Sequence, residues 1–475
     1  MDILKITTTL LLVSLSNVQA SPIYATYLSI SGKLELSQVE VGSTLYSANL
    51  NHILGTNPMR FIVDMASVQT LSEVTEDGVE RPSLSANRLT IPRVAVGNGL
   101  YHVEMQVVES APLTFQLSTV DQKSCFSVSP LDEPAMNNID PLGGTNPPGH
   151  TFPTVHTYMM LVNPSSPSPV YSPGEITITS IASSENLTMG SSDFSIRFSA
   201  CGQTEITGYF YHVTSLDSQL SSLLEAPANC QEYSDGNHDF RYCDYQTNIE
   251  ISSGSLLGYA GGPLSGSAAL DFGLRDTLSP PINYANPSRF VANDHMFYVV
   301  CPYDYYQLGP ERDMLLNKLQ ESRTDSPICG TVALDNQGSM QGLWYEASYT
   351  NEETQQANEA DHIALVPSNT EPQTTGVLSI GNTQLNSDGY YFDYLETGRL
   401  NRRFSEATTH NQTYCWGRFR NRETRITGSY QPIDGHFFAQ LTSDDRLIIE
   451  PLSDGECPEN EDDWLLTNNA IAFTR

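Results

Sequence analysis

Three histidines and one aspartate in the middle of the chain have the chemistry of a metal-dependent hydrolytic site. They are His150, His156, His212 and Asp271. Imidazole and carboxylate hold Zn²⁺ in catalytic sites, where three protein ligands leave a fourth position open for water. The ion lowers the pKa of that water to about 7, and a further imidazole can stabilise an oxyanion or carry a proton. With 10 His and 55 acidic residues in the chain, such a set also arises by chance, so the flanking sequence must decide.

These four residues lie in or beside segments with the character of β-strands. Alternation of apolar and polar residues predicts strands, and His212 and Asp271 fall inside two of them. His156 stands just before a third, and His150 follows a stretch rich in Pro, Gly and Asn. The predicted strands here cover residues 158–162, 176–181, 194–198, 209–213, 249–251 and 270–274, with helices at 217–224 and 311–319.

Four short segments of this region occur in a characteristic order. They read Val170-Tyr-Ser-Pro-Gly-Glu-Ile-Thr-Ile178, Tyr209-Phe-Tyr-His-Val213, Ile251-Ser-Ser-Gly-Ser-Leu-Leu-Gly-Tyr-Ala-Gly-Gly262 and Ala268-Ala-Leu-Asp-Phe-Gly-Leu274. In order and spacing they resemble the lysostaphin-type (M23) zinc endopeptidases, which cut the peptide cross-links of bacterial cell walls. The resemblance covers about residues 140–305. It implies a small, mostly antiparallel β-sheet domain with a groove over the sheet.

The catalytic motif of that family is only partly present. The family's zinc ligands are a His, an Asp four residues later and the second His of a final His-x-His. His150 matches the first ligand, and His212 matches a catalytic histidine. Thr154 stands where the Asp ligand is expected, and Ala269 and Asp271 replace the two final histidines.

Two interpretations of this degenerate motif remain open. If an insertion lengthens the first loop by two residues, His156 takes the place of the Asp ligand. His150, His156 and Asp271 would then form a two-histidine, one-carboxylate zinc site, with His212 as the catalytic residue. In the other interpretation the site is catalytically inactive, and these residues only make hydrogen bonds. Even with zinc bound, the loss of one transition-state donor at Ala269 would cost about 10²–10³ in rate.

The resemblance therefore implies three possible functions. The first is a secreted cell-envelope protein whose peptidase-like domain is catalytically degenerate and binds peptidoglycan or a protein partner. The second is an active zinc endopeptidase that cleaves peptidoglycan peptides with a rearranged site. The third is a structural or adhesion protein in which the middle domain has no binding or catalytic role.

Composition and charge indicate an exported, globular protein. Residues 1–20 have the Lys, the apolar run and the small residues of a signal peptide, with cleavage expected after Ala20. No later stretch is apolar enough to cross a bilayer. The net charge of −32 argues against nucleic acid and anionic membranes as partners. The compartment expected is the periplasm or the cell exterior.

The cysteines support export. An even count of eight in an exported chain implies disulfides, and none forms the CxxC pair of a thiolate metal site. Two local bridges are expected, Cys301 with Cys329 and Cys415 with Cys457. The pairing of the other four remains open.

The chain as a whole is predicted to be mainly β and multi-domain, with a central antiparallel peptidase-like sheet flanked by small all-β domains. Residues 34–46 and 89–101 repeat one β-hairpin pattern, which places a duplicated domain at residues 21–135. The peptidase-like domain is expected at 140–308, a linker helix at 309–327 and a C-terminal all-β barrel or sandwich at 328–475.

Overall fold

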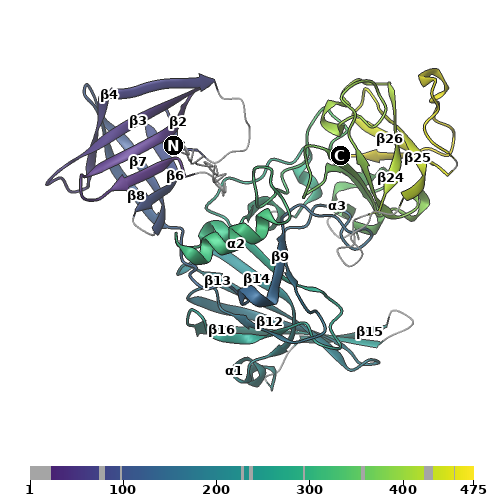
Figure 1. The fold of residues 1–475 in the computed structure, drawn as a ribbon, viewed down its shortest axis with the longest axis horizontal. Helices are drawn as coiled ribbons and strands as arrows, with labels where there is room; N and C mark the ends of the chain where they lie inside the picture. Colours follow the sequence, from purple (N-terminus) through teal and green to yellow (C-terminus); the bar gives the residue numbers. More distant parts are fainter. Residues whose placement is uncertain are drawn as a thin grey trace, which may run out of the picture.

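The computed structural model describes residues 23–73, 81–96, 99–225, 229–234, 239–291, 295–354, 359–421, 432–453 and 455–475. The predicted signal peptide therefore lies outside the described residues. The molecule is mainly β and has three domains, with an antiparallel sheet in the middle and a smaller β domain on either side (Figure 1). This confirms the prediction of a mainly β, multi-domain protein with a central antiparallel sheet.

The N-terminal domain is one sheet closed on itself. Its strand order is β1-β2-β3-β4-β8-β7-β6-β5, and parallel pairs β1–β6 and β2–β5 join its two ends. The repeated hairpins form β2–β3 and β6–β7, and their apolar residues fill the interior because side chains alternate along a strand. The strands are β1 (Ala25–Leu28), β2 (Lys33–Val41), β3 (Thr44–Ile53), β4 (Arg60–Glu73), β5 (Ser83–Ser85), β6 (Arg88–Val96), β7 (Gly99–Ser110) and β8 (Leu113–Gln122).

The middle domain is a large antiparallel sheet with a hydrophobic core on one face. Its main strand order is β15-β16-β12-β13-β14-β18-β10-β9, with β17 joined to β11 and β14. All six predicted strands of this region are present. The strands are β9 (Met136–Asp140), β10 (Thr157–Leu161), β11 (Ser168–Tyr171), β12 (Ile176–Asn186), β13 (Ser191–Ala200), β14 (Gln203–Leu216), β15 (Asn229–Ser234), β16 (Asp239–Ile251), β17 (Leu256–Ala260), β18 (Ala269–Asp276) and β19 (Val299–Val300).

Two predicted helices are found in the middle region. The first is α1 (Ser218–Ser221), which begins at the side chain of Asp217 and continues into η2 (Ser222–Glu225). The second is α2 (Pro310–Gln320), which leads along the chain toward the C-terminal domain. Three buried leucines of α2 belong to the core of the middle sheet. The remaining short helices are η1 (Glu133–Ala135), η3 (Pro287–Arg289), η4 (His295–Tyr298), η5 (Pro302–Tyr305), α3 (Asn351–Thr354), η6 (Glu359–Asp361), η7 (Thr383–Leu385), η8 (Phe404–Glu406) and η9 (Glu461–Asp463).

The C-terminal domain is a closed barrel in which β20 to β27 follow one another in sequence order. Trp344 and Trp416 are fully buried in its aromatic interior, as expected for core residues, and the Arg475 guanidinium lies 4.3 Å from the centre of the Trp344 ring. The strands are β20 (Gly342–Glu346), β21 (Ile363–Pro367), β22 (Thr375–Ile380), β23 (Asp388–Asp393), β24 (Thr413–Arg420), β25 (Pro432–Leu441), β26 (Arg446–Leu452) and β27 (Ile471–Thr474).

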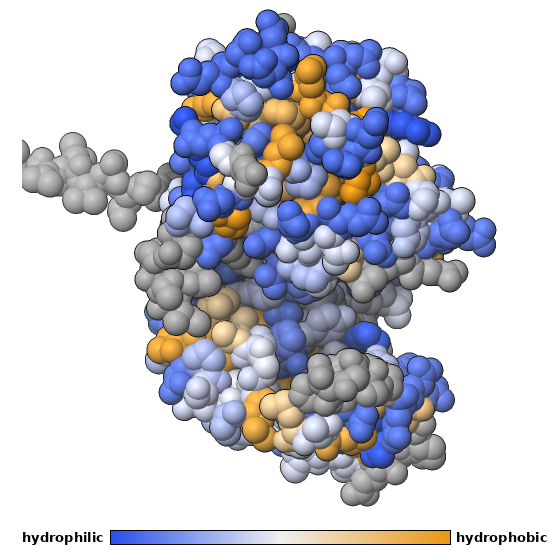
Figure 2. All heavy atoms as spheres, turned by 90° about the vertical axis from the view of Figure 1, so that its right-hand side faces the viewer, coloured by the Kyte–Doolittle hydropathy of each residue, from blue (hydrophilic) through white to orange (hydrophobic). Residues whose placement is uncertain are grey.

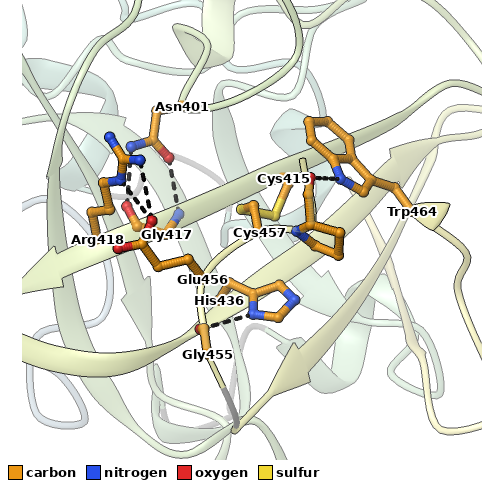
Figure 3. The surroundings of a disulfide bond; sticks show 10 residues. Asn401, Cys415, Gly417, Arg418, His436, Gly455, Glu456, Cys457 and Trp464 are labelled. Atoms are coloured by element: carbon orange, nitrogen blue, oxygen red, sulfur yellow. Dashed lines mark hydrogen bonds and ion pairs between the residues drawn. A yellow bond between two sulfur atoms is a disulfide. The ribbon is translucent and has the colours of Figure 1, made fainter. Parts of the chain in front are cut away.

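All eight cysteines are paired. The predicted bridges Cys301–Cys329 and Cys415–Cys457 are both present, and the other two are Cys125–Cys201 and Cys230–Cys243. Figure 3 shows the barrel bridge beside Trp464, whose indole N–H donates to the carbonyl of Pro458. Four disulfides fit folding in an oxidising compartment.

None of the helices in the described ranges is long and apolar enough to span a membrane.

Candidate functional site

Asp271 lies at the centre of the candidate site, on β18 between β10 and β14. In the register of the sheet it stands opposite Tyr158 on one side and Tyr211 on the other. Leu270 and Phe272, its neighbours along β18, point into the core. Alternation therefore places the Asp271 carboxylate on the face opposite the core. It is nevertheless only 2 % exposed, because neighbouring side chains cover it.

Tyr209 is one of these covering side chains, and Gly273 makes room for it. A β-carbon at Gly273 would lie 2.2 Å from the Tyr209 ring. Glycine is therefore the residue that lets the ring lie against β18. The Tyr209 ring is 4.4 Å from that of Tyr211, and its hydroxyl lies 3.3 Å from Nδ1 of His156.

His156 is buried beside the carboxylate. Its Nε2 lies 3.2 Å from Oδ2 of Asp271, and only 4 % of the residue is exposed. Burial, followed by the nearby His150 and His212, lowers the pKa of His156 to about 3. The imidazole is therefore neutral at physiological pH. Nε2 of His156 and Oδ1 of Asp271 have no hydrogen-bond partner.

His212 approaches the same carboxylate from a β-bulge. Phe194 pairs with Val213 and Ile196 with Phe210, so β14 has one more residue than β13 at this point. Phe210 and Val213 both enter the core, and the bulge leaves Tyr211 and His212 on the outer face. The backbone φ of His212 is +67°, an uncommon value for a residue with a β-carbon. Such backbone strain is frequent at functional sites.

The bulge gives His212 two acidic neighbours. Its Nε2 lies 3.5 Å from Oδ2 of Asp271, and its Nδ1 lies 2.7 Å from Oδ2 of Asp193. Burial disfavours its charged form, but the hydrogen bond to Asp193 and the charge of Asp271 outweigh it and raise the pKa of His212. Burial raises the pKa of Asp271 to about 7. The charge of His212 acts to lower this pKa, and the charge of Asp193 acts to raise it.

His150 completes the group from a tight loop. Its backbone pairs with Asn146 through two hydrogen bonds of 2.7 and 2.9 Å. The ring of His150 lies 5.8 Å from that of His156, edge to face. The structure therefore brings together the four residues singled out from the sequence. Thr154, which stands where the Asp ligand is expected, is held inside the loop by backbone hydrogen bonds to Gly143 and Gly144.

The residue types of this group suit zinc, but their arrangement does not. Zinc bonds of about 2.0–2.2 Å place neighbouring tetrahedral ligand atoms roughly 3.3 Å apart. His156 and His212 each lie near that distance from one oxygen of Asp271. Across the described ranges, however, no group of three His, Cys, Asp or Glu side chains could hold a metal ion. As it stands, the site is a carboxylate shared by two imidazoles.

Sequence reasoning missed two residues of this arrangement. Asp193 orients His212, and Tyr209 contacts His156. Both lie in or next to predicted strands, but their roles depend on the bulge in β14 and on Gly273. Neither feature leaves a distinct signal in a single sequence.

The site lies close to the C-terminal barrel. The loop from residue 141 to residue 154 carries His150 and contacts the barrel through Thr151 and Phe152. Figure 2 shows the surface hollowed between the barrel above and the end of the middle sheet below, with largely hydrophilic walls. Tyr158, Tyr211 and His212 are half-buried, so each retains surface that a ligand can contact.

A search against known protein families and curated proteins finds no match for this chain.

Proposed function

We propose that this chain is an exported cell-envelope protein whose middle domain has a lysostaphin-type peptidase frame. It binds peptidoglycan peptides, or a protein of the envelope, without efficient cleavage. The binding surface is the outer face of the middle sheet around Tyr158, Tyr211 and His212.

The arrangement of the resembling segments supports this proposal. Residues 170–178 run through β11 into β12, residues 209–213 lie on β14, and residues 268–274 enter β18. The last two segments are neighbours in the sheet and bring His212 and Asp271 together. A peptidase-like domain in which His212 and Asp271 belong to one site requires this proximity.

The proposal that cleavage is inefficient rests on one observation, the enclosure of Asp271. Its Oδ2 is shared by His156 and His212, and the carboxylate is almost fully buried. Ala269, two residues earlier on β18, supplies no imidazole to stabilise a transition state. A carboxylate closed off in this way is poorly placed to act on a substrate, whereas the tyrosines beside it can still contact one.

Sedimentation with insoluble peptidoglycan tests the proposal. We expect the purified protein to sediment with the wall material and to release no soluble peptide fragments, as measured by mass spectrometry. Tyr211→Ala removes a half-buried ring from the binding face, and we expect it to weaken binding about tenfold. Tyr101→Ala, a half-buried tyrosine of the N-terminal domain, serves as the matched control. Absence of sedimentation, or equal losses in both variants, would contradict the proposal.

A zinc endopeptidase with ligands His150, His156 and Asp271 is the second candidate. It is favoured by two buried atoms that make no hydrogen bond, Nε2 of His156 and Oδ1 of Asp271. A cation would satisfy such atoms. Stoichiometric zinc in the purified protein, lost in His150→Ala, would support this candidate. A protein that lacks zinc after purification with zinc present, and whose stability a chelator leaves unchanged, would exclude it.

A further inference from the structure

A buried histidine joins the C-terminal barrel to the loop that carries His150. His362 lies just before β21 and is 2 % exposed. Its ring is parallel to that of Phe152, at 9° and 5.9 Å between ring centres. Tyr345 and Tyr349 approach it edge-on at 5.1 and 5.3 Å. The imidazole is therefore packed among aromatic rings at the joint between two domains.

One hydrogen bond of His362 requires the neutral form of its ring. The backbone N–H of Glu346 donates to Nδ1 of His362 at 3.3 Å, so Nδ1 acts as an acceptor. The proton of the neutral ring then lies on Nε2, which is buried without a partner. A protonated imidazole has no acceptor nitrogen. Protonation therefore breaks the bond from Glu346 and places a charge between aromatic rings.

Charged groups of both signs surround this histidine. Arg289 of η3 lies over the Tyr345 ring, 4.9 Å from its centre, and opposes a second positive charge. The charges of Asp361 of η6 and Glu346 of β20, and a hydrogen bond to the backbone of Asp361, favour protonation. Burial is the largest influence, and the balance lowers the pKa of His362 from 6.5 to about 4.

Two hydrogen bonds beside the stacked pair hold the loop to the barrel. The Ser379 hydroxyl donates to the carbonyl of Thr151 at 2.7 Å, and the N–H of Phe152 donates to Oε2 of Glu359 at 2.9 Å. At Gly381 a β-carbon would lie 2.3 Å from the Thr151 hydroxyl, so the two domains meet in close contact here. Such contact leaves little room for a ring that must reorient to find new partners.

We propose that His362 is an acid-released clamp, which holds residues 141–154 against the C-terminal barrel while neutral and frees that loop when protonated. The clamp fixes the loop that carries His150, so its release opens one side of the candidate site. This inference does not depend on the proposed function, because it concerns only the joint between the two domains.

The direction of the pH effect follows from the linkage of protonation to opening. The open form has an ordinary histidine pKa of 6.5, and the closed form has a lowered one of about 4. The clamp is therefore at full strength above pH 6.5 and weakens as the pH falls toward 4. Between pH 6.5 and pH 4, opening takes up one proton. The ratio of closed to open forms therefore falls about tenfold for each pH unit of acidification.

Hydrogen exchange followed by mass spectrometry tests the clamp in the full chain. With rates corrected for the intrinsic effect of pH, we expect the protection of residues 141–156 to fall about tenfold per pH unit below 6.5. His362→Gln keeps an acceptor for Glu346 but cannot be protonated, so its protection should stay level over the same range. His410→Gln, at an exposed histidine of the same barrel, should respond like the wild type.

The proposal also requires that the loss be local. Residues 89–96 of β6 in the N-terminal domain should keep their protection while residues 141–156 lose theirs. Level protection in the wild type, or parallel losses in the wild type and His362→Gln, would overturn the proposal. A simultaneous loss in β6 would also overturn it, because acid would then act on the whole molecule. If His362→Gln folds poorly, the comparison of residues 141–156 with residues 89–96 in the wild type still tests the proposal.

Discussion

At the scale of single residues, the candidate site depends on a carboxylate held away from water. Asp271 is enclosed by His156, His212 and the ring of Tyr209, and its pKa is raised to about 7 by burial. A buried carboxylate costs stability unless its partners fully satisfy it. Oδ1 of Asp271 has no hydrogen-bond partner, so this requirement is not met. The protein therefore gives up stability to keep an acid at this position.

Replacing this acid by its amide should stabilise the protein. We expect Asp271→Asn to raise the free energy of unfolding by about 1–3 kcal/mol at pH 8, where the carboxylate is ionised. Denaturant unfolding monitored by circular dichroism measures the change. Asp193→Asn, at a partly exposed carboxylate, should change it much less. A loss of stability in Asp271→Asn would show that the ionised group is held by a strong partner, as the zinc candidate requires.

Gly273 provides a second residue-scale prediction. An added methyl group would meet the Tyr209 ring at 2.2 Å, so Gly273→Ala must displace that ring. We expect a loss of about 1–3 kcal/mol in unfolding free energy, typical of overpacking. Gly266→Ala has open space around it and should be nearly neutral. Equal effects in both variants, measured by thermal unfolding, would contradict the account of how Tyr209 is positioned.

The four central residues of the site could be singled out from sequence because their side chains suit hydrolytic chemistry and they lie in or beside recognisable strands. The geometry between them could not. Whether His156 and Asp271 converge depends on the pairing of β10 with β18, and the approach of His212 depends on a single extra residue in β14. These are matters of register, and alternation in one strand does not specify which strand lies beside it.

At the scale of elements, α2 shows how periodicity can identify a helix and leave its role open. The sequence predicted a helix at residues 311–319, and its position in the chain suggested a linker. Leu315 and Leu319 are fully buried in the core of the middle sheet, so the helix is also part of that domain. By contrast, β23 of the barrel is hard to recognise as a strand from its sequence. It begins with Asp388 and Gly389, residue types that strands usually lack.

Truncation of α2 at a buried position tests its contribution to the middle domain. We expect Leu319→Ala to reduce the unfolding free energy by about 2–5 kcal/mol, the usual cost of emptying a leucine site in a core. Asn317→Ala, at an exposed position of the same helix, should have an effect within about 0.5 kcal/mol. If the helix were only a connector, both variants would unfold like the wild type in denaturant titrations.

At the scale of the whole molecule, the three domains are joined by buried polar groups that weaken in acid over different pH ranges. At the N-terminal joint, Lys123 lies 2.9 Å from Oδ2 of Asp276, which also accepts from the Tyr305 hydroxyl. Burial alone would raise the pKa of Asp276, but Lys123 and these hydrogen bonds lower it below 3.8. Its contribution is present above pH 3.8 and is lost as the pH falls through the lowered value.

Acid should therefore open the two joints in a fixed order. We expect the barrel joint at His362 to loosen between pH 6.5 and pH 4, while the joint at Lys123 and Asp276 persists to lower pH. Small-angle scattering across this range should show an expansion before any loss of secondary structure. Lys123→Met removes the positive partner of a buried carboxylate and should bring the second transition to higher pH. Loosening of the N-terminal joint first would contradict this order.

The four disulfides have a mechanical consequence. Cys125–Cys201 and Cys301–Cys329 belong to the core of the middle sheet or pack against it, and Cys230–Cys243 joins β15 to β16. The fourth bridge lies within the barrel, so no disulfide links the middle sheet to the barrel strands. When the ends of the molecule are pulled apart, side-chain contacts at the joint between these two domains should yield before the bonds inside either domain. A protein built in this way would lengthen in steps under tension, and its cross-linked parts would stay folded and ready to reassemble when the force is removed.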